Sequence, residues 1–188
     1  FANTSSFTSI TLPSNLVTIG DQAFQNSDLT SIIVPNSVTT IGQQAFESSP
    51  LTSAVINNGT IGDYAFRSIT TLTSLTLNSG VTSIGQQSFD NLGITTVTIP
   101  STVTSMGNSA FASNSNLTSA IINSTVIGLG SFSNSPLLST VTLSNNLLSI
   151  GSSAFIATGL TSITIPNTVT SLGTSSFNDT SLSSIVFD

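Results

Sequence analysis

The chain has no cysteine and no histidine, and it carries very few charged side chains. Without cysteine it cannot form disulfides, thiolate zinc sites or a cysteine nucleophile. Without histidine it cannot form a Ser-His-Asp triad. Only 4% of its residues are Asp, Glu, Lys or Arg, against roughly 25% in ordinary soluble domains. Solvation of the surface must therefore depend on Ser, Thr and Asn, and little is left for catalysis.

Positive charge is almost absent, since Arg67 is the only cation. Nucleic-acid binding requires clustered Lys or Arg to neutralise phosphates, and anionic membranes attract polybasic segments. The longest apolar runs are a few residues long, far short of a bilayer span. The sequence therefore predicts no nucleic-acid partner and no direct membrane insertion.

The acidic side chains are the remaining candidates for chemistry, and they are scattered along the sequence. They are Asp21, Asp28, Glu47, Asp63, Asp90, Asp179 and Asp188. No two of them lie in adjacent repeats at the same repeat position, so neither a paired-carboxylate mechanism nor a metal-ligand spacing is indicated. We expect solvated loop carboxylates, with weak calcium binding as the alternative. The sequence predicts no catalytic residue, no metal site and no cofactor.

What the chain does contain is an internal repeat whose unit is a little over twenty positions long. Glycine is followed four positions later by phenylalanine eight times, at Gly20/Phe24, Gly42/Phe46, Gly62/Phe66, Gly85/Phe89, Gly107/Phe111, Gly128/Phe132, Gly151/Phe155 and Gly173/Phe177. We expect the glycine to supply a turn with positive φ. Self-similarity at this period indicates a solenoid of stacked coils.

Each repeat also contains an apolar triplet with the spacing L-x-x-I-x-V. The nine triplets are Phe7-Ile10-Leu12, Leu29-Ile32-Val34, Leu51-Ala54-Ile56, Leu72-Leu75-Leu77, Ile94-Val97-Ile99, Leu117-Ala120-Ile122, Leu138-Val141-Leu143, Leu160-Ile163-Ile165 and Leu182-Ile185-Phe187. Their last two members alternate with period two, which predicts nine strands that each bury one face. Pro or Asn ends most of these strands, where a lost ladder donor or a turn-forming amide is suitable.

A second short apolar pair, such as Val38 and Ile41, follows each strand and predicts a second wall of the coil. One coil cannot bury such faces alone, but stacked coils can. Strands would then lie about 4.8 Å apart. Phe46, Phe66 and Phe89 are expected to be stacked neighbours inside the solenoid.

The repeat, written out in LTSIIVPNSVTTIGQQAF at 29 and LTSITIPNTVTSLGTSSF at 160, resembles the BspA-like or treponemal type of leucine-rich repeat. That family's unit reads roughly L-x-x-I-x-I-P-x-x-V-x-x-I-G-x-x-A-F, and the match covers essentially the whole chain. The chain departs from the family where a Cys often follows the Phe, since QNSD stands at 25 to 28. The resemblance implies a β-rich, right-handed solenoid with one parallel β-sheet, short second-wall segments and a surface location.

We therefore predict a single leucine-rich repeat solenoid over residues 1–188, with about eight coils, a ninth strand and both ends uncapped. The third and sixth coils, which start at Leu51 and Leu117, are both shortened between strand and glycine. Their separation by three coils suggests duplication of a three-coil block and predicts a periodic notch along one wall.

The outward strand positions are rich in Ser and Thr and form the candidate ligand face. Its residues are Thr11, Ser31, Ser53, Thr76, Thr98, Ser119, Thr142 and Thr164. Such residues also suit any strand by propensity and cross-strand packing. The resemblance nevertheless implies that a ligand would meet this sheet.

Apolar residues near the two ends are candidates for end-to-end contact with another copy. They are Phe1, Phe7, Leu182, Ile185 and Phe187. Five N-x-S/T sequences, at Asn3, Asn58, Asn116, Asn123 and Asn178, are candidate glycosylation sites that matter only in a eukaryotic or viral source.

The leading functional hypothesis is a non-enzymatic, extracellular structural or adhesive repeat protein on a cell surface or a virion appendage. It would belong to a longer array or to a head-to-tail filament. The alternative is an adhesin that binds a host surface protein or glycan through the strand face. Ice binding is a third hypothesis, although Ile and Val interrupt the Thr column.

Overall fold

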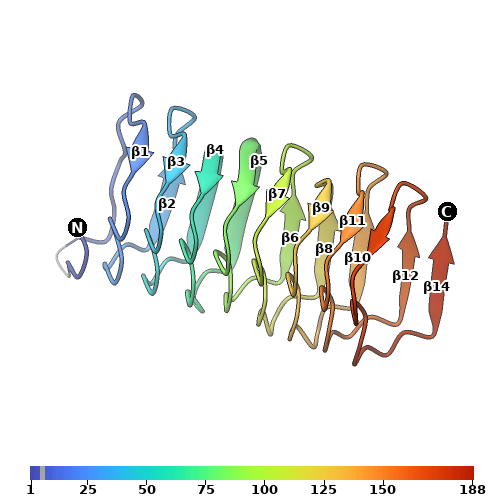
Figure 1. The fold of residues 1–188 in the computed structure, drawn as a ribbon. Coiled ribbons are helices and arrows are strands. Elements are labelled where there is room, and N and C mark those ends of the chain that lie inside the picture. Colours follow the sequence, from blue (N-terminus) through green and yellow to red (C-terminus); the bar gives the residue numbers. More distant parts are fainter. Residues whose placement is uncertain (5–6) are drawn as a thin grey trace.

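The computed structural model describes residues 1–4 and 7–188. They form a parallel β-solenoid of about eight turns, with its two termini at opposite ends of the stack (Figure 1). Residues 1–4 and 7–188 contain strands and turns but no helix.

Short strands make up two walls of each coil. Their bounds are β1 Thr18–Ile19, β2 Ser31–Val34, β3 Thr40–Ile41, β4 Ser53–Ile61, β5 Ser74–Ile84, β6 Thr96–Ile99, β7 Ser105–Met106, β8 Ser119–Ile122, β9 Val126–Ile127, β10 Thr140–Leu143, β11 Ser149–Ile150, β12 Ser162–Ile165, β13 Ser171–Leu172 and β14 Ser184–Phe187. Every strand pairing is parallel.

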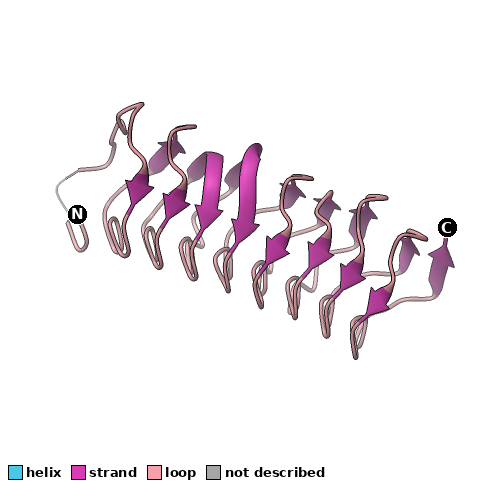
Figure 2. Cartoon of the chain, turned by 45° about the horizontal axis from the view of Figure 1, so that its top comes forward, coloured by secondary structure: helices cyan, strands magenta, loops and turns pink. Residues whose placement is uncertain are grey.

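The first wall contains β2, β6, β8, β10, β12 and β14, and the second contains the two-residue strands β1, β3, β7, β9, β11 and β13 (Figure 2). Strands β4 and β5 run without interruption through both walls. Residues 57–59 and 78–80, which are Asn, Ser and Gly, continue the strand in these two coils. The shortened third coil is therefore one bent strand, β4.

Phenylalanine forms the centre of the core. From Phe1 through Phe177, consecutive rings of the ladder have centroids 4.9–5.5 Å apart and planes within 16° of parallel. Phe46, Phe66 and Phe89 are fully buried, stacked neighbours, as predicted. The alternating burial of β2, β6 and β12 confirms that one face of these strands packs on this ladder, whereas all four residues of the end strand β14 are exposed.

The predicted solenoid with a parallel first wall is confirmed, and the backbone pairings divide that wall into three ladders. They are β2-β4-β5, β6-β8-β10 and β12-β14. Over residues 1–4 and 7–188 no pairing joins β5 to β6 or β10 to β12. The two breaks lie three coils apart.

Proline explains where the ladders stop. In other coils the residue after the strand donates its N–H to the preceding coil, from Asn123 to the Ile99 carbonyl at 3.0 Å and from Ser144 to the Ile122 carbonyl at 3.1 Å. The same position is Pro35, Pro100 and Pro166 in the second, fifth and eighth coils. Proline has no N–H to donate. Each coil that carries it therefore begins a new ladder.

The prediction of nine strands is wrong for the same reason, the proline of the following coil. Residues 7–12 form no strand, so the first wall has eight. The next coil carries Pro35. Its Thr30 N–H donates to the Thr8 carbonyl at 3.0 Å, but no strand pairing with residues 7–12 follows this bond.

The predicted role of the repeat glycine is also wrong. None of the eight repeat glycines has positive φ; that conformation falls two residues later, for example on Gln22, Gln44 and Tyr64. The glycine is required by close approach instead. A Cβ on Gly62 would lie 2.8 Å from the Gly42 carbonyl carbon of the preceding coil, closer than real Cβ atoms come.

Candidate functional site

The outward residues of the first wall form a face with little charge. Thr11, Ser31, Thr76, Thr98 and Thr142 are exposed, as is Thr164, whereas Ser53 and Ser119 are half-buried. Strand register aligns these residues in columns, for example Thr98 with Ile121 and Thr142. The structure thus places the predicted ligand face on one wall, but the ladder breaks divide it.

Aliphatic residues interrupt the hydroxyl column in a regular way. Threonine flanks both breaks, as Thr76 and Thr98 at the first and Thr142 and Thr164 at the second. The middle strands β4 and β8 carry Val55 and Ile121 at the same position. From β5 onward the face therefore alternates between aliphatic ribs and hydroxyl-lined junctions, whereas Ile33 on β2 departs from this pattern.

The junction between β10 and β12 is open. A furrow of about 450 Å³ lies there, lined by both strands and by Val186 and Asp188. Its hydroxyls come from Thr140, Thr142 and Thr164, together with Ser139 and Ser162. No cation lines it.

A column of hydroxyls beside the strands adds side-chain bonds between coils. Thr52 donates to the Thr30 carbonyl at 3.0 Å, and Thr118 donates to the Thr95 carbonyl at 3.0 Å. Within the described chain, Thr95 and Thr161 make no equivalent bond to the preceding coil across the two ladder breaks, and Ser139 makes none within a ladder. The two breaks therefore lack this side-chain bond as well as the backbone pairing.

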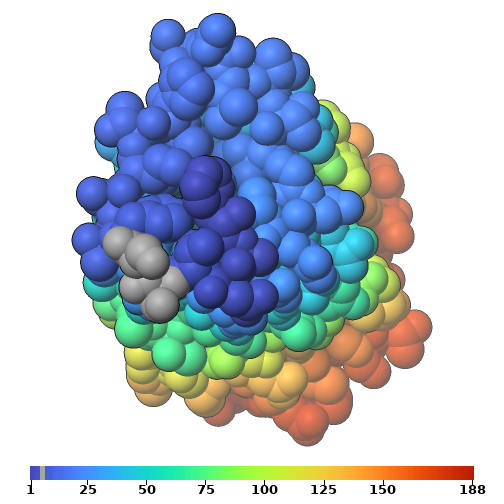
Figure 3. Space-filling model, turned by 90° about the vertical axis from the view of Figure 1, so that its left-hand side faces the viewer, coloured from blue at the N-terminus to red at the C-terminus, as the bar shows by residue number. Residues whose placement is uncertain are grey.

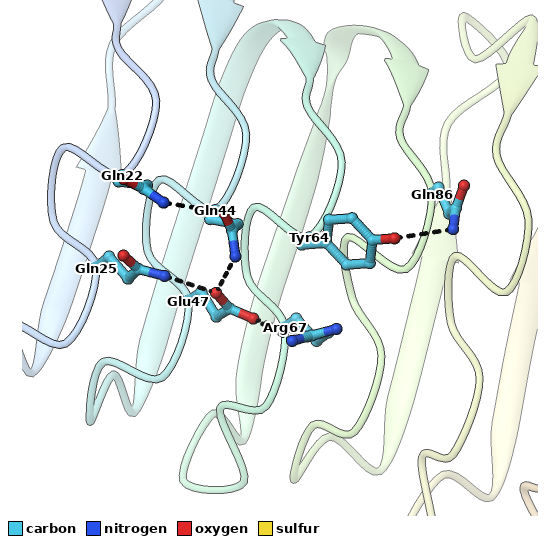
Figure 4. A network of polar contacts seen from close by, with 7 residues as sticks. All are labelled: Gln22, Gln25, Gln44, Glu47, Tyr64, Arg67 and Gln86. Atoms are coloured by element: carbon cyan, nitrogen blue, oxygen red, sulfur yellow. Dashed lines mark hydrogen bonds and ion pairs between the residues drawn. The ribbon is translucent and has the colours of Figure 1, made fainter.

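Glu47 and Arg67 pair between adjacent coils within a network of polar side chains (Figure 4). Glu47 is only 5% exposed and accepts from Gln25 at 2.8 Å, from Gln44 at 2.7 Å and from Arg67 Nη2 at 2.6 Å. The Arg67 guanidinium also lies 4.8 Å from the centre of the Tyr64 ring. The expectation of solvated loop carboxylates is wrong for Glu47, because Arg67 lies in the adjacent coil and pairs with it.

Asp21 and Asp63 have a structural role that sequence reasoning missed. Asp21 accepts from the backbone N–H of Gln43, and Asp63 from that of Gln86, each at 2.7 Å. Both carboxylates therefore tie one coil to the next. Over residues 1–4 and 7–188, no three side chains of His, Cys, Asp or Glu gather as a metal site would require.

Burial raises the pKa of the Asp90 carboxyl above its ordinary value, although a hydrogen bond with Ser113 and the charge of Arg67 act in the opposite direction. Asp90 follows its ladder phenylalanine directly, as Glu47 and Arg67 follow theirs. The three groups thus share one column along the coils, and their placement fits a structural role.

The loops of the second to fourth coils border a shallow, open polar hollow. It measures about 560 Å³ and is lined by Asn36, Asn57, Asn58 and Asn78, with Ser79 and Gly80. It lies at the shortened third coil, where we expected a notch. The amides bond to one another and to backbone, since Asn78 donates to Asn57 at 2.5 Å and Asn58 to the Asn36 carbonyl at 2.9 Å.

The residues predicted for end-to-end contact lie at opposite ends. Phe1 and Phe187 are each 67% exposed and Ile185 is 45% exposed, whereas Phe7 and Leu182 are half-buried. Figure 3 faces the N-terminal end, where Phe1 and neighbouring apolar residues line a hollow of about 360 Å³.

The five N-x-S/T sites differ in access. Asn3, Asn116 and Asn178 are exposed, and Asn58 and Asn123 are half-buried. The Asn58 amide nitrogen already donates to two carbonyls of the preceding coil.

Stacked coils with a parallel first wall and a central phenylalanine ladder define a leucine-rich repeat solenoid. The family model for the BspA type leucine rich repeat region matches in six copies, over residues 1–118 and 59–183. The chain belongs to this family.

Solved bacterial structures agree with this assignment. A leucine rich cell surface protein from Faecalibacterium prausnitzii is 30% identical with a TM-score of 0.65, and the match covers 98% of this chain and 47% of that one. A leucine-rich repeat protein from Bacteroides ovatus is 25% identical with a TM-score of 0.58, covering 96% and 60%. The Treponema pallidum leucine rich repeat protein, 21% identical with a TM-score of 0.64 over 86% and 71%, shares the fold.

The chain spans about half to three fifths of the length of the Faecalibacterium and Bacteroides proteins. A comparison with curated proteins finds no match. Among the described residues, no helix is long and apolar enough to cross a membrane.

Proposed function

We propose that this chain is a non-enzymatic, surface-displayed repeat protein that binds a partner molecule through the first wall. The observation that carries the proposal is the long, nearly uncharged face of outward Ser, Thr and aliphatic residues on a rigid stack of coils. The Faecalibacterium relative, described as a cell surface protein, supports an extracellular location. A partner would be a protein or glycan of another cell surface.

Charge substitution tests this proposal. Lysine at Thr76, Thr98 and Thr142 introduces three exposed cations into the first wall, where they disrupt a neutral interface. We expect the triple variant to lose binding to fixed epithelial cells, measured by flow cytometry with fluorescently labelled protein.

The matched control carries the same three charges on the second wall, at the exposed positions Thr40, Ser105 and Ser171. It should bind as the unmodified chain does, and circular dichroism should show both variants folded. Binding that survives in the first-wall variant, or is lost equally in both, would overturn the proposal.

A structural role by stacking of coils is a second candidate, favoured by the apolar hollow at the N-terminal face and by exposed Ile185 and Phe187 at the other. Further coils of a longer array, or another copy, would cover both faces. If copies stack, electron microscopy should show filaments with a repeat of roughly 40 Å, eight coils at strand spacing. Strictly monomeric protein in sedimentation at high concentration would contradict filament formation.

Ice binding is not proposed. A lattice match needs even spacing, and the first wall is divided between β5 and β6 and between β10 and β12. Ile33, which is 65% exposed, further interrupts the threonine column.

A further inference from the structure

We propose that the furrow between β10 and β12, together with the unpaired junction between β5 and β6, binds a neutral oligosaccharide. This inference rests on the proposed binding role of the first wall and names the class of ligand. It starts from the backbone. At a paired junction Thr140 N–H donates to the Thr118 carbonyl at 3.2 Å. At the junction with β12, the equivalent bond from Ser162 to Ser139 is absent from the described chain.

The groups that would make those bonds lie beside exposed strand residues of the furrow, where water or the hydroxyls of a ligand can bond to them. In the furrow each of the two strands contributes both N–H and C=O groups to one space, as parallel pairing requires. Both kinds of group accompany the hydroxyls of Thr142 and Thr164.

The width of the junction selects against a peptide strand. Cα atoms of β10 and β12 come within 8 Å of each other, whereas a strand between them would need two strand spacings, about 9.6 Å. A hydroxyl fits better, because it is one donor and two acceptors and can bridge an N–H on one side and a carbonyl on the other. A saccharide presents a row of such hydroxyls.

Charge selects a neutral saccharide. The furrow has no cation to pair with a sulfate or carboxylate, and its one ionisable group is the carboxylate of Asp188. The whole chain carries a net charge of −6. An anionic glycan would therefore be repelled and left without a partner.

In the part of the chain that the structure describes, the junction between β5 and β6 also lacks a strand pairing. Thr76 and Thr98 flank it as Thr142 and Thr164 flank the first, with the aliphatic Ile121 on the strand between. The two junctions are three coils apart, roughly 14 Å at strand spacing. One oligosaccharide chain can span that distance and engage both, so that the second contact benefits from high effective concentration.

The experiment is calorimetric titration of the folded 188-residue chain with defined probes. The neutral probes are maltopentaose, xylopentaose, N-acetylchitopentaose and lacto-N-neotetraose, and the charged probe is a heparin pentasaccharide. We expect at least one neutral probe to bind and the heparin probe to give no heat. Binding of none of the neutral probes, or preference for heparin, would overturn the inference.

The double variant Thr142→Val and Thr164→Val removes two hydroxyls and keeps the β-branched shape. We expect it to bind the active neutral probe about tenfold or more weakly, as lost hydrogen bonds imply. The control Thr18→Val with Thr40→Val makes the same change on the second wall and should bind as the unmodified chain. Equal binding by the two double variants would show that the saccharide does not bind between β10 and β12.

The inference and the proposed function can fail separately. If no neutral saccharide binds but lysine at Thr76, Thr98 and Thr142 still abolishes binding to cells, the first wall recognises a protein. The proposed function then stands, and the saccharide furrow does not exist.

Discussion

At the scale of single residues, charge in this chain serves cohesion between coils. Glu47 receives donors from Gln25 in the preceding coil and from Arg67 in the following one. A buried carboxylate is tolerated when it is paired and hydrogen-bonded, and removal of its partners is costly. Asp90 lies in the same column, but its charged form is less well stabilised. Burial raises its pKa more than the Ser113 hydrogen bond and the Arg67 charge lower it.

The raised pKa of Asp90 predicts a specific dependence of stability on pH. The folded chain keeps the Asp90 proton at pH values where the unfolded chain has lost it, so the free energy of unfolding falls as pH rises through the raised pKa. Asp90→Asn removes this titration. It should be as stable as the unmodified chain at low pH and more stable at neutral pH, in urea unfolding followed by circular dichroism.

Ser113→Ala gives an internal check, since it removes a hydrogen bond that lowers the Asp90 pKa. Its loss of stability between acidic and neutral pH should be larger than that of the unmodified chain. Asp90→Asn proving less stable than the unmodified chain at neutral pH would show that the Arg67 and Ser113 contacts outweigh burial.

The role of the repeat glycine could be predicted only in part from the sequence. The recurrence of glycine four residues before phenylalanine predicted a constrained backbone at each coil, and such a constraint exists. Its kind was not predictable, because positive φ and close approach both favour glycine. Only the neighbouring coil, with the Ile41 carbonyl oxygen 2.8 Å from a Cβ built on Gly62, distinguishes them.

At the scale of elements, proline controls the length of each ladder. Pro166 stands where Asn123 stands two coils earlier, and Asn123 has an N–H that closes its ladder. Pro166→Asn should restore this donor toward the Leu143 carbonyl and let β12 pair with β10. We expect the Thr164 amide to exchange with deuterium about tenfold or more slowly than in the unmodified chain.

Pro136→Asn is the matched control, because Pro136 is exposed and lies outside the strands. It should leave the Thr164 exchange rate unchanged. Closure of the furrow should also weaken binding of a neutral saccharide. An unchanged Thr164 rate in Pro166→Asn would mean that proline does not cause the break.

Much of the element level followed from the repeat, including the position of eight strands, the stacked phenylalanines and the shortened third coil. The division into ladders did not. Pro35, Pro100 and Pro166 were visible as strand ends, but a missing N–H breaks a ladder only if it faces the neighbouring coil. The direction of the missing N–H therefore determines where the furrow between β10 and β12 opens. It also determines which parts of the ligand face are junctions and which are ribs.

At the scale of the whole molecule, stability should grow by the addition of coils, because each coil contacts only its neighbours. Asp188 occupies the position of Pro166 in the next coil, as the pairing of Ile165 with Phe187 shows. A second copy of residues 167–188 joined after Asp188 would therefore continue in register. It would cover Ile185 and Phe187, which are 45% and 67% exposed.

We expect the extended chain to gain about 1–3 kcal/mol in free energy of unfolding, because the added coil buries its own apolar side chains together with Ile185 and Phe187, and this burial slightly exceeds the cost of ordering the coil. Urea unfolding measures this gain. The control is the same extension with serine in place of the copied Phe177, Leu182 and Ile185, which cannot form a core and should add nothing. If both extensions leave stability unchanged, the coils do not stack as independent, additive units, and the exposed Ile185 and Phe187 are not a surface on which another coil can pack.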